Sequence, residues 1–141
     1  MNKIKKMSLI SNSVLLFWFF LDMTGVKLGE VTLVTRAYRE DGIFFLIFAV
    51  SIIFFWKWEK TGKYILSGWL LLWFITQFIS HWYFTIFGPW EEKINFFAET
   101  LKLIPTSERY IPDLYHVILH VLILLALILT IRCLRATKEQ K

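Results

Sequence analysis

The chain has 141 residues, of which 57% are hydrophobic and 18% aromatic, and its formal net charge is +5. A soluble domain typically contains about 45–50% apolar residues. Here the excess is gathered in blocks, which favours a protein of the lipid bilayer. The basic residues lie at the ends of these blocks, so we expect no nucleic-acid partner. The single cysteine, Cys133, excludes an internal disulfide, a CxxC redox pair and a cysteine-rich zinc site.

Four blocks are apolar enough to form transmembrane helices, and they predict an all-α integral membrane fold, a four-transmembrane-helix bundle in one domain, 1-141. The first block follows a basic start, as in a cleaved signal peptide, but no A-x-A-like cleavage site comes after it, so we expect a retained helix. The second block is short for a span, and an earlier start through residues 36–39 would lengthen it. The predicted spans are about 8-24, 42-58, 64-87 and 113-131.

Two connections on the predicted outer side carry further patterns. The first contains Val31–Thr35, a β-prone run with no obvious partner strand. The second, residues 88–112, contains apolar side chains at three- and four-residue spacing. This stripe predicts an extra amphipathic interfacial helix, which acts as a cap on the bundle or as a lid over the polar site described below. The residues of the stripe are Ile94, Phe97, Ala98, Leu101 and Ile104.

Charge predicts the orientation of the chain. With both termini inside, ten of the sixteen Lys and Arg lie on that side, opposed only by Glu59 and Glu139. This is the positive-inside asymmetry, and Trp and Tyr residues near the ends of the spans, Tyr110 among them, fit aromatic belts. We therefore expect cytoplasmic N- and C-termini in a cell membrane, and the small size and short loops favour a bacterial cytoplasmic membrane. The ten basic residues are Lys3, Lys5, Lys6, Lys57, Lys60, Lys63, Arg132, Arg135, Lys138 and Lys141.

All three histidines lie near the outer ends of the third and fourth spans. His81 and His120 fall at the same depth, roughly 10 Å below the outer surface at about 1.5 Å per helical residue. Ionisable groups in lipid are expensive, so they usually mark a site or a partner. The candidate polar pocket in the outer leaflet comprises Asp22, Gln77, His81, Arg109, Asp113, His116 and His120. Arg109 joins it, in salt-bridge reach of Asp113, only if the fourth helix begins before Pro112.

Three chemistries could use this cluster. The first is a metal ion held by His116 and His120, four residues apart on one helix, with His81 and either Asp113 or Asp22 completing the shell. The second is haem b held between His81 and His120. The third is an organic or lipid ligand whose head group meets His, Arg and Asp, with histidine acid–base chemistry. The competing interpretation is structural: Asp113 caps the fourth helix, and Gln77 and His81 fix the helix packing.

Charged residues and motifs that the sequence lacks argue against several classes of function. The middles of the spans carry no charged residue, which argues against a proton-coupled transporter. No phosphate loop or nucleophile elbow occurs. We expect a small multi-pass accessory or ligand-binding membrane protein that contacts the lipid bilayer and binds a lipid or small molecule, with a protein partner or homo-oligomer left open. The alternative is a membrane-embedded enzyme or redox protein that binds a metal, haem or lipid head group in the same pocket.

Overall fold

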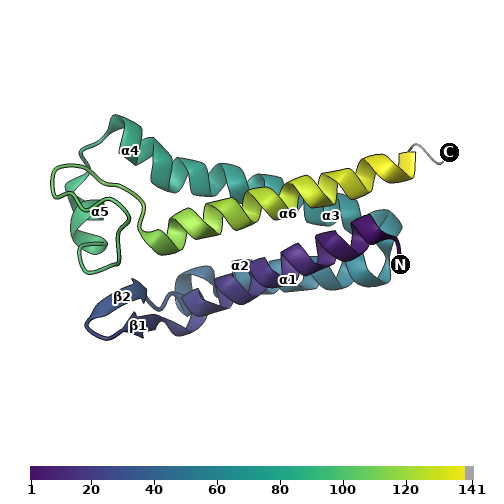
Figure 1. The fold of residues 1–141 in the computed structure, drawn as a ribbon, viewed down its shortest axis with the longest axis horizontal. Coiled ribbons are helices and arrows are strands. Elements are labelled where there is room, and N and C mark those ends of the chain that lie inside the picture. The colour runs from purple at the N-terminus through teal and green to yellow at the C-terminus, as the bar shows by residue number, and fades with distance from the viewer. Residues whose placement is uncertain (139–141) are drawn as a thin grey trace.

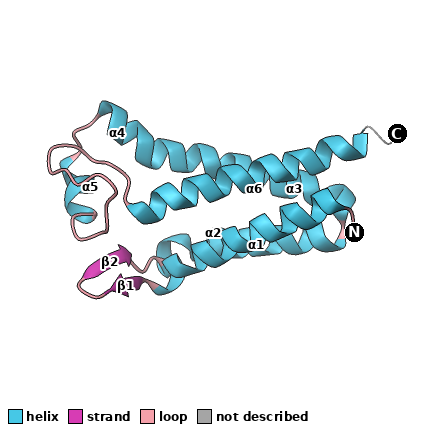
Figure 2. Ribbon diagram, in the orientation of Figure 1, coloured by secondary structure: helices cyan, strands magenta, loops and turns pink. Residues whose placement is uncertain are grey.

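The computed structural model describes residues 1–138, and the protein is mostly helical, at 74%. Within these residues, three helices are long and apolar enough to cross a membrane: Lys3–Thr24, Glu59–Phe87 and Leu114–Ala136. Figure 2 shows how helices dominate the fold. The elements in chain order are α1 (Lys3–Thr24), β1 (Val26–Leu28), β2 (Val31–Val34), α2 (Tyr38–Lys57), α3 (Glu59–Gln77), the π-helical turn η1 (Phe78–Trp82), α4 (Tyr83–Phe87), α5 (Glu91–Phe96) and α6 (Leu114–Lys138).

The long helices lie side by side along the molecule (Figure 1). α1 packs against α2 and α6, and α3 packs against the same two helices. The start of α1 and the end of α6 lie at one end of the molecule, which we call the terminal end. The two strands and α5 lie at the other, which we call the hairpin end and which corresponds to the predicted outer side. Glu139 and Lys141, two of the charged residues predicted to lie on the inner side, are outside the described residues.

The second predicted span, 42-58, is helical but differs from the other three. α2 begins earlier, at Tyr38, and its first turn carries Glu40 and Asp41. Acidic side chains interact favourably with the positive end of the helix dipole, which explains why the helix starts before the apolar block. The uncharged stretch from Gly42 to Trp56 is about 22 Å long at about 1.5 Å per residue, shorter than a hydrocarbon core of about 30 Å. A fourth membrane span therefore stays a prediction.

Aromatic side chains fill the space between the long helices. The ring of Trp73 lies 4.7 Å from that of Phe19 and 5.2 Å from that of Phe48, so it joins α3 to α1 and α2. The same helices also present large apolar side chains on their opposite faces. A helix that is apolar all round needs protein on one side and lipid on the other. Exposed examples are Phe17, Ile43, Leu46 and Leu72.

The β-prone run at 31–35 does have a partner, contrary to expectation. Val31–Val34 pairs antiparallel with Val26–Leu28, and the turn between them contains Gly29 with φ of 65°, a conformation that glycine adopts without strain. Val26–Leu28 was not expected as a strand because its three residues are too short for a periodic signal. The hairpin begins two residues after the end of α1, so it lies at the hairpin end of the molecule.

The predicted amphipathic helix over 94–104 is wrong beyond its first turn. α5 ends at Phe96, and the chain then turns so that Thr100 forms a bridge with Thr32 of the hairpin. Thr32 N donates to Glu99 O at 3.3 Å, and Leu101 N donates to Thr32 O at 2.9 Å. These bonds satisfy backbone groups that a helix would otherwise pair, so tertiary contact overrides the helical spacing.

Candidate functional site

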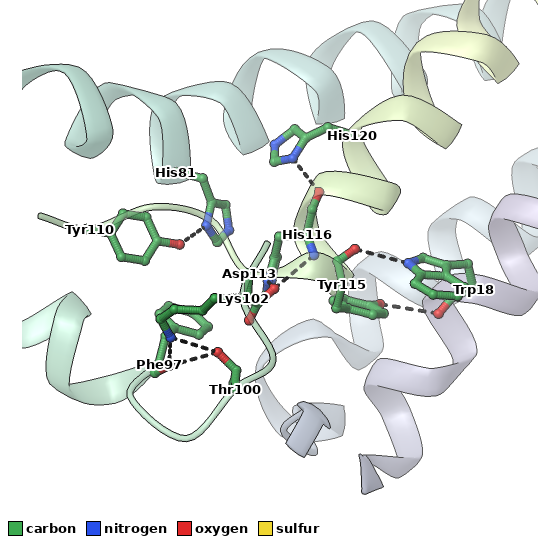
Figure 3. A network of polar contacts seen from close by, with 10 residues as sticks. All are labelled: Trp18, His81, Phe97, Thr100, Lys102, Tyr110, Asp113, Tyr115, His116 and His120. Carbon is green, nitrogen blue, oxygen red and sulfur yellow. Dashed lines mark hydrogen bonds and ion pairs between the residues drawn. The ribbon is translucent and has the colours of Figure 1, made fainter. Parts of the chain in front are cut away.

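The three histidines meet at the hairpin end (Figure 3). The ring centroid of His81 lies 4.2 Å from that of His116 and 5.7 Å from that of His120. His81 comes from η1, and the other two come from the first two turns of α6. His81 and His120 are 5% and 7% exposed, so both rings face the protein interior. The sequence predicted this placement at a shared depth.

The π-helical turn at Phe78–Trp82 positions His81. Within it the N–H of Tyr83 donates to the carbonyl of Phe78, five residues earlier in the chain. One extra residue in a turn rotates the following side chains around the helix axis, and such turns are frequent at functional sites. Nothing in the sequence marks this turn, because no proline or glycine lies within it.

Asp113 organises the start of α6. Its Oδ1 accepts the backbone N–H of His116 at 2.9 Å, which is the capping contact expected for this residue, and it also accepts from His116 Nδ1 at 2.7 Å. Burial by itself would raise the pKa of Asp113, but the hydrogen bonds from His116 outweigh burial and hold that pKa below its ordinary value. Asp113 is therefore an ionised carboxylate that is only 1% exposed.

His120 is fixed by its own helix. Its Nδ1 donates to the carbonyl of His116 at 2.5 Å, which places the proton on Nδ1 and leaves a lone pair on Nε2. That Nε2 is buried and has no hydrogen-bond partner among the described residues. The ring of His120 also meets that of Trp82 edge to face, with centroids 6.0 Å apart.

Sequence reasoning missed two members of the site. Tyr110, which the sequence assigned to an aromatic belt, is 1% exposed and its hydroxyl is hydrogen-bonded to His81 Nδ1. Burial raises the pKa of Tyr110, so the phenol stays neutral. Lys93 of α5 donates to the carbonyl of Ser80, and burial lowers the pKa of its ammonium. Tyr110 lies in an irregular stretch and Lys93 in the short helix α5, and in neither place does sequence spacing predict contacts with the histidines.

A cavity of about 790 Å³ opens beside the histidines. Its volume lies within the range of about 300–1,000 Å³ that is usual for small-molecule sites. The cavity is bounded by the end of α1, the chain between β2 and α2, η1, α5 and the start of α6. Among the predicted pocket residues, the cavity wall contains Asp22, Gln77, His81, Asp113 and His116.

Arg109 lies outside this cavity. α6 begins at Leu114 rather than before Pro112, so the prediction that Arg109 shares a helix face with Asp113 is wrong. Its guanidinium is exposed and donates to the carbonyl of Thr85 at 3.0 Å. The prolines at 105 and 112 bracket a stretch without helical hydrogen bonds, which explains why the helix starts late.

The positions of the three histidines favour neither the metal hypothesis nor the haem hypothesis. Within residues 1–138 no group of three or more His, Cys, Asp or Glu side chains could hold a metal ion. The planes of His81 and His116 are only 33° apart at 4.2 Å, so these rings meet by their faces rather than by converging nitrogens. A haem between His81 and His120 needs space for its macrocycle. The ring of His81 already packs against that of His116 at 4.2 Å, and the ring of His120 against that of Trp82 at 6.0 Å, so the geometry does not favour haem.

A second polar cluster, absent from the sequence analysis, lies toward the terminal end between α1 and α6. Ser8 Oγ and Thr130 Oγ1 are 2.9 Å apart, and the amide of Asn12 donates to Ser8 O at 2.8 Å and to Thr130 Oγ1 at 3.2 Å. All three side chains are fully buried. Hydrogen bonds of this kind hold helices together inside a membrane, so we assign the cluster to packing.

Comparisons of the chain with protein-family models, with curated proteins and with solved structures give no match.

Proposed function

We propose that this is a multi-pass membrane protein in which α1, α2, the Glu59–Phe87 helix and α6 all cross the bilayer, with the terminal end in the cytoplasm. The charge distribution supports this, because the basic residues of the terminal end fit the positive-inside rule. The contact between Lys5 Nζ and Glu59 Oε2, at 3.0 Å, joins α1 to the α2–α3 connection at that end. The alternative places α2 at the surface of a three-span protein.

Cysteine labelling tests this topology. In a Cys133→Ser background, Lys27→Cys should react in intact cells with a membrane-impermeant maleimide, whereas Lys60→Cys should react only after the cells are opened. Both lysines are exposed, so the difference reports their side of the membrane. Labelling of both positions in intact cells would show that α2 does not cross and would overturn the four-span arrangement.

Our functional conclusion is that the protein binds a small organic molecule or a lipid head group at the hairpin end. The observation that carries this is the cavity of about 790 Å³, whose wall contains buried polar groups without partners. Each unpaired polar group in an apolar medium costs on the order of several kcal/mol, and among the described residues Asp113 Oδ2 and Gln77 Oε1 are the unpaired buried atoms whose residues line this cavity. We infer that a ligand supplies the missing hydrogen bonds.

A cavity-filling pair of variants tests this function. Ser80 lines the cavity, so Ser80→Trp should expel small molecules that copurify with the detergent-extracted protein. Ser107→Trp adds the same ring to an exposed position of the connection before α6, outside the cavity, and should leave copurification unchanged. Native mass spectrometry measures the bound mass. Equal retention in both variants, or no bound molecule in the parent protein, would contradict the proposal.

A membrane enzyme is the second candidate, and the contact between Asp113 and His116 favours it. A carboxylate 2.7 Å from Nδ1 orients an imidazole so that its Nε2 can accept a proton from a bound molecule. If the protein is an enzyme, His116→Ala should stop conversion of the bound molecule while the molecule still binds. Time-resolved mass spectrometry of the released ligand separates an enzyme from a binding protein.

A further inference from the structure

Two buried acceptors in the cavity wall have no donor. Asp113 Oδ2 and Gln77 Oε1 each lack a hydrogen-bond partner among the described residues. The hydroxyl of Thr100 lies beside the Asp113 carboxyl group, but its one proton is directed to Phe97 O at 2.8 Å. The ammonium of Lys102 also binds Phe97 O and reaches Thr100 Oγ1 at 3.3 Å. A ligand that pairs with these two acceptor atoms must therefore be a hydrogen-bond donor.

The charge of the cavity wall has the matching sign. Five carboxyl side chains line the cavity, against the cations Arg36 and Lys93. Asp22 and Asp41 are among these five residues, so carboxyl groups from α1 and from the start of α2 face one cavity. Carboxylates that share a cavity repel each other, and a bound cation would relieve that repulsion.

Both cations are already engaged with other groups. The guanidinium of Arg36 lies over the ring of Tyr38, 4.5 Å from its centroid, and the ammonium of Lys93 lies 4.4 Å from the ring centroid of Phe84. These contacts stabilise the cations where they are, so neither is positioned as a free anion-binding group. The remaining aromatic side chains of the wall, Trp90, Phe96 and Phe97, offer ring surface to an apolar body or to a cation.

We propose that the ligand of this cavity is an organic ammonium compound, whose N–H groups donate to Asp113 Oδ2 and Gln77 Oε1 while its apolar part lies against Trp90 and Phe97. This assignment rests on the proposed binding function and adds the chemical class of the ligand. Two sources carry this chemistry, a free amine and the ammonium group of a zwitterionic lipid.

Three probes of one shape test the assignment: 2-phenylethylamine, 2-phenylethanol and 3-phenylpropionate. They share the ring and differ in the end group, which is cationic, neutral or anionic. Binding to the detergent-solubilised full-length protein is measured by calorimetry. We expect the amine to bind at least tenfold more tightly than the alcohol and the acid, because only the amine supplies charged donors to the unpaired acceptors.

Variants locate the binding. Asp113→Asn should weaken amine binding at least tenfold, whereas Glu30→Gln, the same loss of charge at the exposed hairpin turn, should change it less than twofold. Because Asp113 also caps α6, Asp41→Asn gives a second reading at a position outside that cap, with a weakening of at least threefold expected. Unchanged binding in both cavity variants would overturn the assignment.

The outcomes separate this inference from the function on which it rests. Tighter binding of the alcohol or the acid, lost in Ser80→Trp, would overturn the ammonium assignment and leave a ligand-binding cavity. Binding of none of the three probes, together with no copurified molecule, would overturn both.

Binding measured in two defined lipids distinguishes a free amine from the ammonium group of a lipid. In nanodiscs of phosphatidylethanolamine, a lipid source would compete with 2-phenylethylamine and weaken its binding at least tenfold relative to phosphatidylglycerol nanodiscs. A free-amine source would give equal affinity in both lipids. Tighter binding in phosphatidylethanolamine would contradict the ammonium assignment from either source.

Discussion

Gly62→Ala is expected to lower the free energy of unfolding by about 3 kcal/mol, at the upper end of the usual cost of overpacking. A Cβ atom at Gly62 would lie 2.4 Å from the Cα and the N of Phe55, both backbone atoms of α2. A backbone cannot move aside as a flexible side chain can, so α2 and α3 would have to separate. Because Phe55 is fully buried beside this contact, the separation would also loosen the core. Unfolding of the purified protein by a denaturing detergent measures the change.

Gly68→Ala is the matched control in the same helix. Beyond the backbone of its own helix turn, no described atom lies within 4 Å of a Cβ built at Gly68, so the new methyl group meets open space. Alanine in a helix interior is favoured over glycine by roughly 0.5–1 kcal/mol, so this variant should be slightly more stable than the parent. A loss of stability at Gly68 equal to that at Gly62 would show that the α2–α3 contact is not the cause.

Tyr110→Ala is expected to cost about 3–5 kcal/mol, the usual range for removing a buried aromatic side chain. Tyr110 joins the connection before α6 to His81 and lies against Phe97, with ring centroids 5.6 Å apart. Removing it would leave a void and a buried His81 nitrogen without its partner. Proteolysis of residues 97–113 in the detergent-solubilised protein should become faster, while the long helices remain protected.

Two companion variants divide this effect into its parts. Tyr110→Phe keeps the ring and removes only the hydroxyl, so it should cost about 1–3 kcal/mol, the range for leaving a buried polar group unsatisfied. Tyr83→Ala removes an equally large side chain that is 48% exposed, and should change stability by less than about 0.5 kcal/mol. An effect of Tyr83→Ala as large as that of Tyr110→Ala would contradict a specific role for Tyr110.

The candidate site could be predicted in part because the spacing of residues around a helix is fixed. His116 and His120 are four residues apart, so any helix through them places both on one side. The apolar blocks fixed which ends of the helices share a level, and this was enough to bring His81 to the depth of His120. The partner of Asp113 was also within reach of sequence reasoning, since a cap contacts its own first turn. Arg109 was misplaced because its position depended on where α6 begins.

The sequence by itself determined the helical character of this protein, its apolar segments and the level of its histidines, because these follow from local periodicity and from the length of apolar runs. Only the tertiary structure decided the rest. It paired Val31–Val34 with Val26–Leu28, ended α5 at Phe96, and brought Tyr110 onto His81. The physical reason is that irregular segments satisfy their backbone groups through contacts between residues far apart in the chain, and such contacts leave no periodic trace in the sequence.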